Sequence, residues 1–288
     1  MSRHFEITVP ASIANLGAGF DTLAVAVQLY LRLQVKVLDG KGKLNFKFIK
    51  QSLQGENYIE RAFRFLAKDT GDDFPSLEVE VHSDIPMSSG LGSSAAALVA
   101  GLRLYSALFP QTEQALLNAA CTLEGHPDNV SAALLGGLTI SYKLPDSSVY
   151  SVKLEWPENL VFTVLTPDIP LGTSDARKVV PTVIPREDAV FNIQRIALLI
   201  HALHSGNYQL LKQAFADRLH QPYRQQLVPG LESALKLEHE DLLGVCLSGA
   251  GPSIVAIAER NLDNIEELLA SSYKSTGIPF NIRRLKAV

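Results

Sequence analysis

The chain has 288 residues, which is long enough for two domains and a large hydrophobic core. It is 47% hydrophobic and 19% charged, a composition that indicates a globular protein. Its formal net charge of −4 argues against a nucleic-acid partner, since such proteins usually carry a basic patch. A small phosphorylated ligand needs only local positive charge and is not excluded.

The two cysteines, Cys121 and Cys246, lie in apolar runs and have neither metal-ligand nor C-x-x-C spacing. We expect buried free thiols in a reducing compartment. The N-terminal residues show no signal-peptide pattern, and no apolar run approaches the roughly 18 residues of a membrane span. We therefore expect a cytoplasmic protein that has no membrane partner.

Apolar periodicity predicts the elements of the first half in chain order. Strands are expected at 5–9, 24–38 and 43–50, a helix at 56–68, a strand at 77–81 and a helix at 93–108. They are followed by a helix at 114–122, a loop at 124–129, a helix at 130–135 and a strand at 138–142. The segment 145–158 is polar and rich in turn residues, so we place a domain boundary there, with domains at 1–152 and 153–288.

The second half is predicted to begin with a strand at 160–165 and to continue with helices near 188–204, 207–219 and 230–238. A strand, glycine turn and strand over 244–258, a helix at 262–273 and a strand at 280–285 complete it. Strands and helices mix without the regular alternation of a Rossmann fold. Both halves are therefore predicted to be α+β.

A loop of small residues joins the strand at 77–81 to the helix that follows it, and Ser93 is predicted to cap that helix. Such a loop directs backbone N–H groups and the positive end of the helix dipole into one volume, where phosphate fits. No Lys follows the glycines, so this is not a Walker A loop, and a tight turn without a ligand is the alternative. The candidate phosphate-binding residues are Pro86, Met87, Ser88, Ser89, Gly90, Leu91, Gly92, Ser93, Ser94, Ala95 and Ala96.

Three further segments are rich in glycine or small polar residues: 9–22, 124–137 and 247–253. Each alone is a weak signal, because loop glycines usually serve turns with positive φ. In this order and at this spacing, the four segments resemble the GHMP kinase superfamily. The N-terminal run and the Glu-Gly-His-Pro-Asp-Asn loop resemble the homoserine kinases in particular, and the resemblance covers nearly the whole chain.

The resemblance implies a two-domain GHMP kinase fold, with a ribosomal-S5-like N-terminal domain and a ferredoxin-like C-terminal domain. It implies ATP and Mg²⁺ as cofactors and L-homoserine as the acceptor, phosphorylated on its hydroxyl on the route to threonine. A homodimer is also implied by relatives. Two alternatives stay open: a GHMP kinase for another small alcohol such as mevalonate, and a catalytically silent ATP-binding regulator.

The resemblance places Ser94 and Glu124 at Mg²⁺, which prefers oxygen ligands. For Glu124 the alternative is a solvated carboxylate at a helix end. Asn129 falls near the place where mevalonate-kinase-like members carry an Asp as candidate base. Phosphoryl transfer has a loose transition state and needs mainly positioning and charge neutralisation, so we expect a mechanism without an obligatory side-chain base.

A zwitterionic amino acid needs a carboxylate clamp, and an arginine fork meets a carboxylate with two hydrogen bonds. The resemblance assigns this clamp to Arg177 and Arg224, and surface ion pairs are the alternative. It assigns the substrate ammonium to Asp128. For His126, substrate contact and a hydrogen bond that orients the loop both stay open.

Asn15 and Asp21 lie in the N-terminal glycine loop, where an amide and a carboxylate suit the hydroxyl and ammonium ends of the substrate. An Asx-turn is the alternative for both. In the C-terminal glycine loop, Gly249 and Gly251 are expected to support the phosphate loop.

Overall fold

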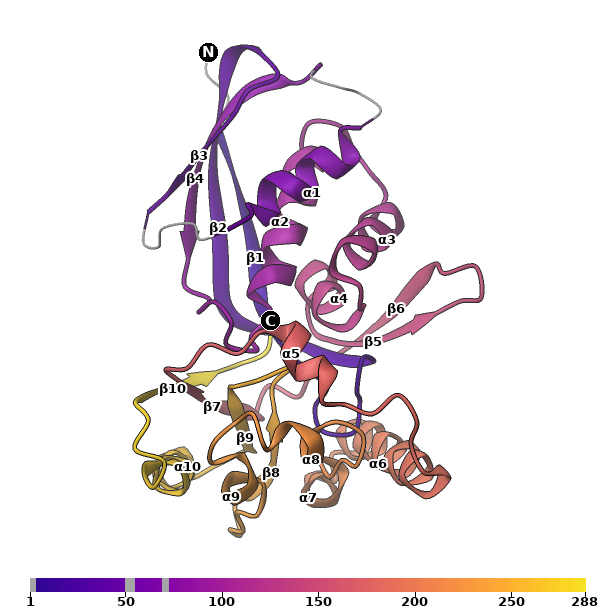
Figure 1. The fold of residues 1–288 in the computed structure, drawn as a ribbon, viewed down its shortest axis with the longest axis vertical. Helices are drawn as coiled ribbons and strands as arrows, with labels where there is room; N and C mark the ends of the chain where they lie inside the picture. The colour runs from indigo at the N-terminus through magenta and orange to yellow at the C-terminus, as the bar shows by residue number, and fades with distance from the viewer. Residues whose placement is uncertain (1–3, 50–54, 69–72) are drawn as a thin grey trace.

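The computed structural model describes residues 4–49, 55–68 and 73–288. Two α+β halves follow one another along the long axis of the molecule, and the C-terminus ends close to their junction (Figure 1). The predicted fold class is therefore confirmed. Residue 50, at the end of a predicted strand, lies outside the described residues.

The first sheet has six strands, and the long strand β2 organises it. β2 pairs antiparallel with β1 along most of its length, with β4 over its second part and with β5 at its start. β3 pairs parallel with β4, and β6 pairs antiparallel with β5. The strands are β1 (His4–Ala14), β2 (Leu23–Lys41), β3 (Leu44–Phe48), β4 (Pro75–Ser83), β5 (Leu138–Lys143) and β6 (Val149–Leu154).

Four helices cover one face of this sheet, and α2 is the central one (Figure 1). Its run of alanine and leucine is buried on nearly all sides, as expected of a helix between a sheet and other helices. A Cβ at Gly101 would lie 2.1 Å from the carbonyl oxygen of Ile59, so glycine is what lets α1 cross α2 this closely. The helices are α1 (Tyr58–Leu66), α2 (Ser93–Ser106), α3 (Glu113–Glu124) and α4 (Asp128–Leu135).

The second sheet is antiparallel throughout, in the order β10-β7-β9-β8. Numbered within this half, the strand order is 4-1-3-2, which is that of a ferredoxin-like unit. The strands are β7 (Val161–Pro167), β8 (Leu242–Leu247), β9 (Ile254–Ala258) and β10 (Phe280–Leu285). The helices are α5 (Thr173–Lys178), α6 (Arg186–Ser205), the 3₁₀ helix η1 (Tyr208–Leu210), α7 (Leu211–Ala214), α8 (Gln221–Arg224), α9 (Leu231–Leu235) and α10 (Leu262–Lys274).

The two halves share one large core. Buried side chains of β7, β8 and β9, among them Phe162, Cys246 and Ile257, belong to the same cluster as those of β1, β2 and α2. After β10 the chain returns to the first sheet, where Ala287 pairs with Val27. The halves are therefore joined by packing and by backbone hydrogen bonds.

Most predicted elements are present, and there are four exceptions in the described part of the chain. The segment expected as turns contains β6, which crosses the predicted domain limit at 152/153 and pairs in the first sheet. The limit itself stays a prediction. The helix expected at 207–219 is wrong, because η1 and α7 end at Ala214. The short helices α5 and α8 were not expected.

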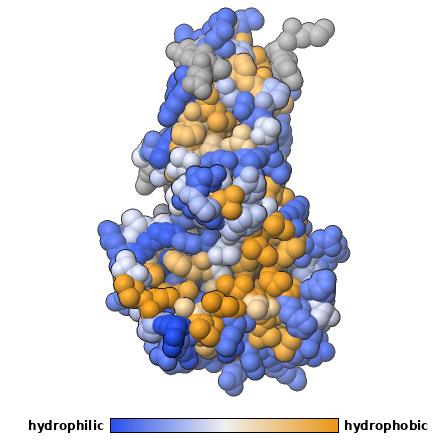
Figure 2. Space-filling model, turned by 90° about the vertical axis from the view of Figure 1, so that its right-hand side faces the viewer, coloured by the Kyte–Doolittle hydropathy of each residue, from blue (hydrophilic) through white to orange (hydrophobic). Residues whose placement is uncertain are grey.

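Cys121 and Cys246 are both buried and unpaired, as predicted, and burial raises the pKa of each thiol to about 12. Apolar side chains gather over the second half of the molecule on the face drawn in Figure 2. Among the described residues, no helix is both long and apolar enough to span a bilayer.

Candidate functional site

A cavity of about 460 Å³ takes its lining from both halves of the chain. Most of the predicted site residues line it: Asn15, Asp21, Ser88, Ser89, Gly90, Gly92, Ser93, Ser94, Glu124, His126, Asp128, Asn129, Arg177, Arg224, Gly249 and Gly251. A larger cavity of about 780 Å³ lies beside α7, α8 and β8, and no predicted site residue lines it. The smaller cavity is the candidate site, since the phosphate loop lines it.

Five predicted residues of the phosphate loop do not line the cavity. The side chains of Leu91, Ala95 and Ala96 are buried in the hydrophobic core, so only their backbone atoms are available to a phosphate. Pro86 and Met87 precede the lining segment, and the Met87 side chain is exposed.

The phosphate loop enters α2 through left-handed backbone conformations, with φ of 51° at Ser88, 79° at Gly90 and 70° at Gly92. The prediction that Ser93 caps the helix is wrong. Gly92 is the N-cap, Ser93 is the first helical residue, and no side chain in the described part of the chain caps this end. The first N–H groups of a 14-residue helix are therefore open to an anion.

The glycine turn between β8 and β9 packs directly against this loop. The hydroxyl of Ser248 donates to the carbonyl oxygen of Gly90 at 2.7 Å, and the N–H of Ser253 donates to that of Ser89 at 3.1 Å. A Cβ at Gly90 would lie 2.4 Å from the Ser248 carbonyl oxygen and 2.8 Å from that of Gly251. The two loops can touch only because Gly90 has no side chain.

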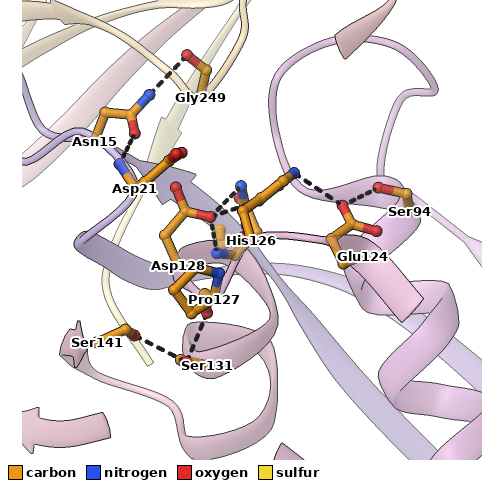
Figure 3. Close-up of polar contacts among 12 residues, drawn as sticks. Asn15, Asp21, Ser94, Glu124, His126, Pro127, Asp128, Ser131, Ser141 and Gly249 are labelled. Carbon is orange, nitrogen blue, oxygen red and sulfur yellow. Dashed lines mark hydrogen bonds and ion pairs between the residues drawn. The ribbon is translucent and has the colours of Figure 1, made fainter. Parts of the chain in front are cut away.

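Ser94 and Glu124 meet at one side of the site (Figure 3). The Ser94 hydroxyl, in the first turn of α2, donates to Oε1 of Glu124, the last residue of α3, at 2.7 Å. The Glu124 side chain is only 11% exposed, so it is not a solvated carboxylate. In the described ranges no group of three or more His, Cys, Asp or Glu is placed to hold a metal. A metal at this pair would take further oxygen ligands from phosphate.

His126 lies between two carboxylates (Figure 3). Its Nδ1 is 2.9 Å from Oδ1 of Asp128, and its Nε2 is 3.8 Å from Oε1 of Glu124. Burial lowers the pKa of His126, but the hydrogen bond to Asp128 and the two nearby negative charges outweigh burial and raise it above its ordinary value. The imidazole therefore connects the predicted metal side of the cavity to the predicted substrate side.

Asp21 and Arg177 form a two-point ion pair across the cavity. The Arg177 Nη1 and Nη2 atoms lie 3.0 and 2.6 Å from the two carboxylate oxygens, and both side chains are about one-third exposed. Asn15 ties the loop in place, since its Nδ2 donates to the Gly249 carbonyl oxygen at 2.9 Å and its Oδ1 accepts from the Asp21 N–H at 3.1 Å. The latter bond spans six residues and is not an Asx-turn.

Arg224 is almost fully buried, with 1% of its surface exposed. Its Nε donates to the Ala176 carbonyl oxygen, and its Nη1 donates to that of Gly249 and contacts Nδ1 of His220. Burial, together with the nearby charge of Arg177, lowers the pKa of Arg224 to about 10. Within the described chain Nη2 has no acceptor, so this atom is the one left for a ligand.

Three residues of the site region, Ser12, Phe20 and His220, are not among the predicted site residues, although Ser12 and Phe20 lie in the segment 9–22. Phe20 lies under the guanidinium groups of Arg177 and Arg224, at 5.7 and 5.2 Å, and stacks on His220 at 5.1 Å. Ser12 is fully buried beside Asn129. The sequence signals for Ser12 are its place in the segment 9–22 and its polar side chain inside an apolar strand.

Comparisons with known proteins identify the family of the chain. The models of the GHMP kinase N-terminal domain and of the GHMP kinase C-terminal domain match residues 57–137 and 199–275. A homoserine kinase of Solibacter usitatus (strain Ellin6076) is 39% identical over 280 residues, which cover 95% of this chain and 91% of the relative. A homoserine kinase of Deinococcus radiodurans is 40% identical over 264 residues, covering 90% and 86%.

The crystal structure of homoserine kinase from Cytophaga hutchinsonii superimposes with a TM-score of 0.85 at 26% identity, covering 99% of this chain and 97% of that one. L. major mevalonate kinase shares the fold, with a TM-score of 0.73 at 17% identity and coverage of 99% and 96%. The fold and the two domain models define this chain as a GHMP kinase, an ATP-dependent kinase of small molecules. Within that superfamily it belongs to the homoserine kinase family.

Proposed function

We propose that the protein transfers the γ-phosphoryl group of ATP to the hydroxyl of L-homoserine, giving O-phospho-L-homoserine in threonine biosynthesis. One observation carries the proposal. A single cavity joins an uncapped helix N-terminus behind a glycine loop to a pair of opposite charges, Asp21 and Arg177. The first feature suits the phosphates of ATP, and the second suits an amino acid.

The charges of the site favour a zwitterion over a plain carboxylate. Arg177 and the free Nη2 of Arg224 suit the substrate carboxylate, while Asp21 and Asp128 suit the ammonium. Mevalonate has a carboxylate and no ammonium, so its carboxylate would compete with Asp21 for Arg177 and offer neither aspartate a cation in exchange. A silent ATP-binding regulator is not favoured either, because the glycines and serines of the phosphate loop are all present.

Ser94 and Glu124 fit Mg²⁺ because both offer oxygen atoms at the end of the phosphate loop, 2.7 Å from each other. When bound there, the metal would neutralise charge on the transferring phosphates. The chain's own contribution is to orient the phosphates with backbone N–H groups and to keep Glu124 in place through Ser94 and His126.

No side chain of the cavity is arranged as an obligatory base in this proposal. Asn129 carries an amide, which takes no proton at neutral pH. Nδ1 of His126 is engaged by Asp128, and its raised pKa keeps it protonated over a wider pH range. In a loose transition state the hydroxyl proton can leave late, to the phosphoryl group itself.

The test is ATP consumption by the purified protein with homoserine, mevalonate, galactose and shikimate, at several Mg²⁺ concentrations. We expect Mg²⁺-dependent turnover of homoserine above all others. Two analogues sharpen the result: 4-hydroxybutyrate lacks the ammonium and 3-amino-1-propanol lacks the carboxylate. Each should lose on the order of tenfold to a hundredfold in kcat/KM, since a charge-assisted hydrogen bond contributes roughly 1.5–3 kcal/mol. Efficient turnover of mevalonate with none of homoserine would contradict the proposal.

The cytoplasmic location and the homodimer stay predictions of the sequence. Size-exclusion chromatography with light scattering tests the homodimer.

A further inference from the structure

The buried strand β1 sends one polar side chain toward the site. Ser12 has no exposed surface, and its backbone N–H donates to the carbonyl oxygen of Leu91 in the phosphate loop at 3.1 Å. Its hydroxyl donates to Oδ1 of Asn129 at 2.7 Å. A single strand residue therefore holds both the phosphate loop and the start of α4.

The space for this contact depends on Gly92. A Cβ there would lie 2.2 Å from the Ser12 hydroxyl oxygen and 3.0 Å from Oδ1 of Asn129. The N-cap glycine of α2, the serine of β1 and the asparagine of α4 thus meet at one point.

The neighbours of the Asn129 amide determine which side its Oδ1 atom faces and which side its Nδ2 atom faces. Ser12 donates to Oδ1 on one side. On the other side, Nδ2 lies 3.3 Å from Oδ1 of Asp128, a carboxylate oxygen that can only accept. A flipped amide would set its carbonyl oxygen against that carboxylate, so the contact with Asp128 selects the orientation. In this orientation the Ser12 hydroxyl donates to Oδ1 and holds that end of the amide in place.

This orientation determines which atom of the Asn129 amide faces the cavity. Asp128, on the Nδ2 side, lines the cavity, whereas the buried Ser12, on the Oδ1 side, does not. Nδ2 is also 3.9 Å from the Cβ position of Gly249, another lining residue. An N–H donor, and not a carbonyl oxygen, is thus presented to the site.

We propose that Ser12 is a positioning residue for phosphoryl transfer: its hydroxyl holds the Asn129 amide with Nδ2 toward the reacting groups. The inference rests on the proposed function for the identity of those groups. A fixed N–H donor stabilises negative charge that grows on oxygen in the transition state, and a freely rotating amide does so only part of the time. The effect should therefore fall on kcat more than on KM.

The experiment is a double-mutant cycle on the full-length protein. Ser12→Ala should lower kcat about tenfold and change both KM values less than about twofold, on the scale of one lost hydrogen bond. Ser12→Thr, which keeps the hydroxyl, should recover most of the rate. In the Asn129→Ala background, Ser12→Ala should change kcat less than about twofold, because the group through which it acts is gone.

Thr139→Val is the matched control, since it removes another buried strand hydroxyl, bonded to the Ala24 carbonyl oxygen at 3.2 Å, outside the cavity lining. It should lower the unfolding temperature and leave kcat unchanged. If Ser12→Ala does not fold, Ser12→Cys retains a side-chain donor, although a weaker one, and should give an intermediate loss of kcat.

Equal losses of kcat from Ser12→Ala in the wild-type and Asn129→Ala backgrounds would overturn the inference, as would a wild-type kcat in Ser12→Ala. The cycle is measured with whichever alcohol of the acceptor panel is turned over fastest. If homoserine is not an acceptor, that result counts against the proposed function, and the role of Ser12 can still be tested with the alcohol that is turned over.

Discussion

At the scale of single residues, Arg177 and Arg224 contact different parts of the chain. Arg177 pairs with a partly exposed carboxylate, whereas Arg224 supplies buried donors to the Ala176 and Gly249 carbonyl oxygens. Arg177→Ala should raise KM for homoserine about tenfold to a hundredfold and leave KM for ATP unchanged, because a charge-assisted hydrogen bond contributes roughly 1.5–3 kcal/mol. Arg177→Lys should recover only part of the loss, since an ammonium cannot reproduce the fork.

Arg224→Ala should raise the same KM and also destabilise the fold by roughly 1–3 kcal/mol, because the buried Ala176 carbonyl oxygen loses its donor, whereas Asn15 still donates to that of Gly249. Steady-state kinetics and urea unfolding measure both effects. Arg283→Ala, at an exposed position of β10, is the control and should change neither. An Arg224→Ala protein of wild-type stability would show that the buried hydrogen bonds contribute little.

His126 and His220 should make the free energy of unfolding depend on pH in opposite directions. The folded-state pKa of His126 is raised by Asp128 and Glu124 against the effect of burial. The contribution of His126 to the free energy of unfolding is thus complete below the unfolded-state pKa of about 6.5 and is lost as pH rises through the folded-state pKa. Burial and the nearby charge of Arg224 lower the pKa of His220, so its contribution is complete above about 6.5 and is lost as pH falls through the folded pKa.

Urea unfolding of His126→Asn and His220→Asn between about pH 5 and 8 measures this difference. Relative to wild type, His126→Asn should cost most at the acid end and His220→Asn most at the alkaline end. Differences that grow in the same direction for both variants would show that one of the two environments is wrongly described.

The sequence predicted most of the cavity residues but not their partners. Small-residue loops and resemblance identify Asp21 and Arg177, yet the ion pair joins residues 156 positions apart. Such a contact depends on how the two halves pack, which local patterns do not specify. The cap of α2 could not be predicted for a similar reason, since Gly92 is required by the contact with Ser12 and not by helix propensity.

At the scale of elements, the contact between the two glycine loops depends on Gly90. An added Cβ would meet the backbone of Ser248 and Gly251, which cannot move aside without separating the loops. Gly90→Ala should therefore lower kcat/KM for ATP on the order of a hundredfold, as misplacement of about 1 Å does in other active sites. Kinetics at varied ATP concentration provide the measurement.

Gly206→Ala is the control for backbone strain alone. Gly206 has φ +71°, close to the +79° of Gly90, and a Cβ there meets nothing within 4 Å. We expect it to cost about 1 kcal/mol of stability and no activity. Equal values of kcat/KM for ATP in Gly90→Ala and Gly206→Ala would mean that the contact between the two glycine loops is not needed for activity.

The elements that were hard to predict are short or have mixed surroundings. β6 is an edge strand in which the apolar Tyr150 and Val152 are exposed, so apolar and polar residues do not alternate between a buried and an exposed face and the strand is not evident beside the turn residues around it. The helix expected at 207–219 is interrupted because the Asp217 carboxylate accepts from the N–H groups of Leu219, His220 and Gln221. These bonds turn the chain into α8, which has only four residues.

At the scale of the whole molecule, the sequence indicates two α+β halves but not how closely they are joined. The shared core and the return of the last residues to β2 depend on contacts between segments at opposite ends of the chain. Chains of this length with two domains often unfold in more than one step. A core that continues across the junction predicts a single step instead.

The only tryptophan can test this prediction, because Trp156 lies at the junction, 6% exposed and packed on Phe162 with ring centroids 4.7 Å apart. We expect its fluorescence and the far-UV circular dichroism of the whole chain to change at the same urea concentration. The proposed site of ATP, Mg²⁺ and homoserine is lined by both halves, so each ligand should move both curves together, by about 2.7 kcal/mol at a hundredfold excess over its dissociation constant. Two separate transitions, of which a ligand moves only one, would show that the halves unfold independently and that the shared core does not couple them.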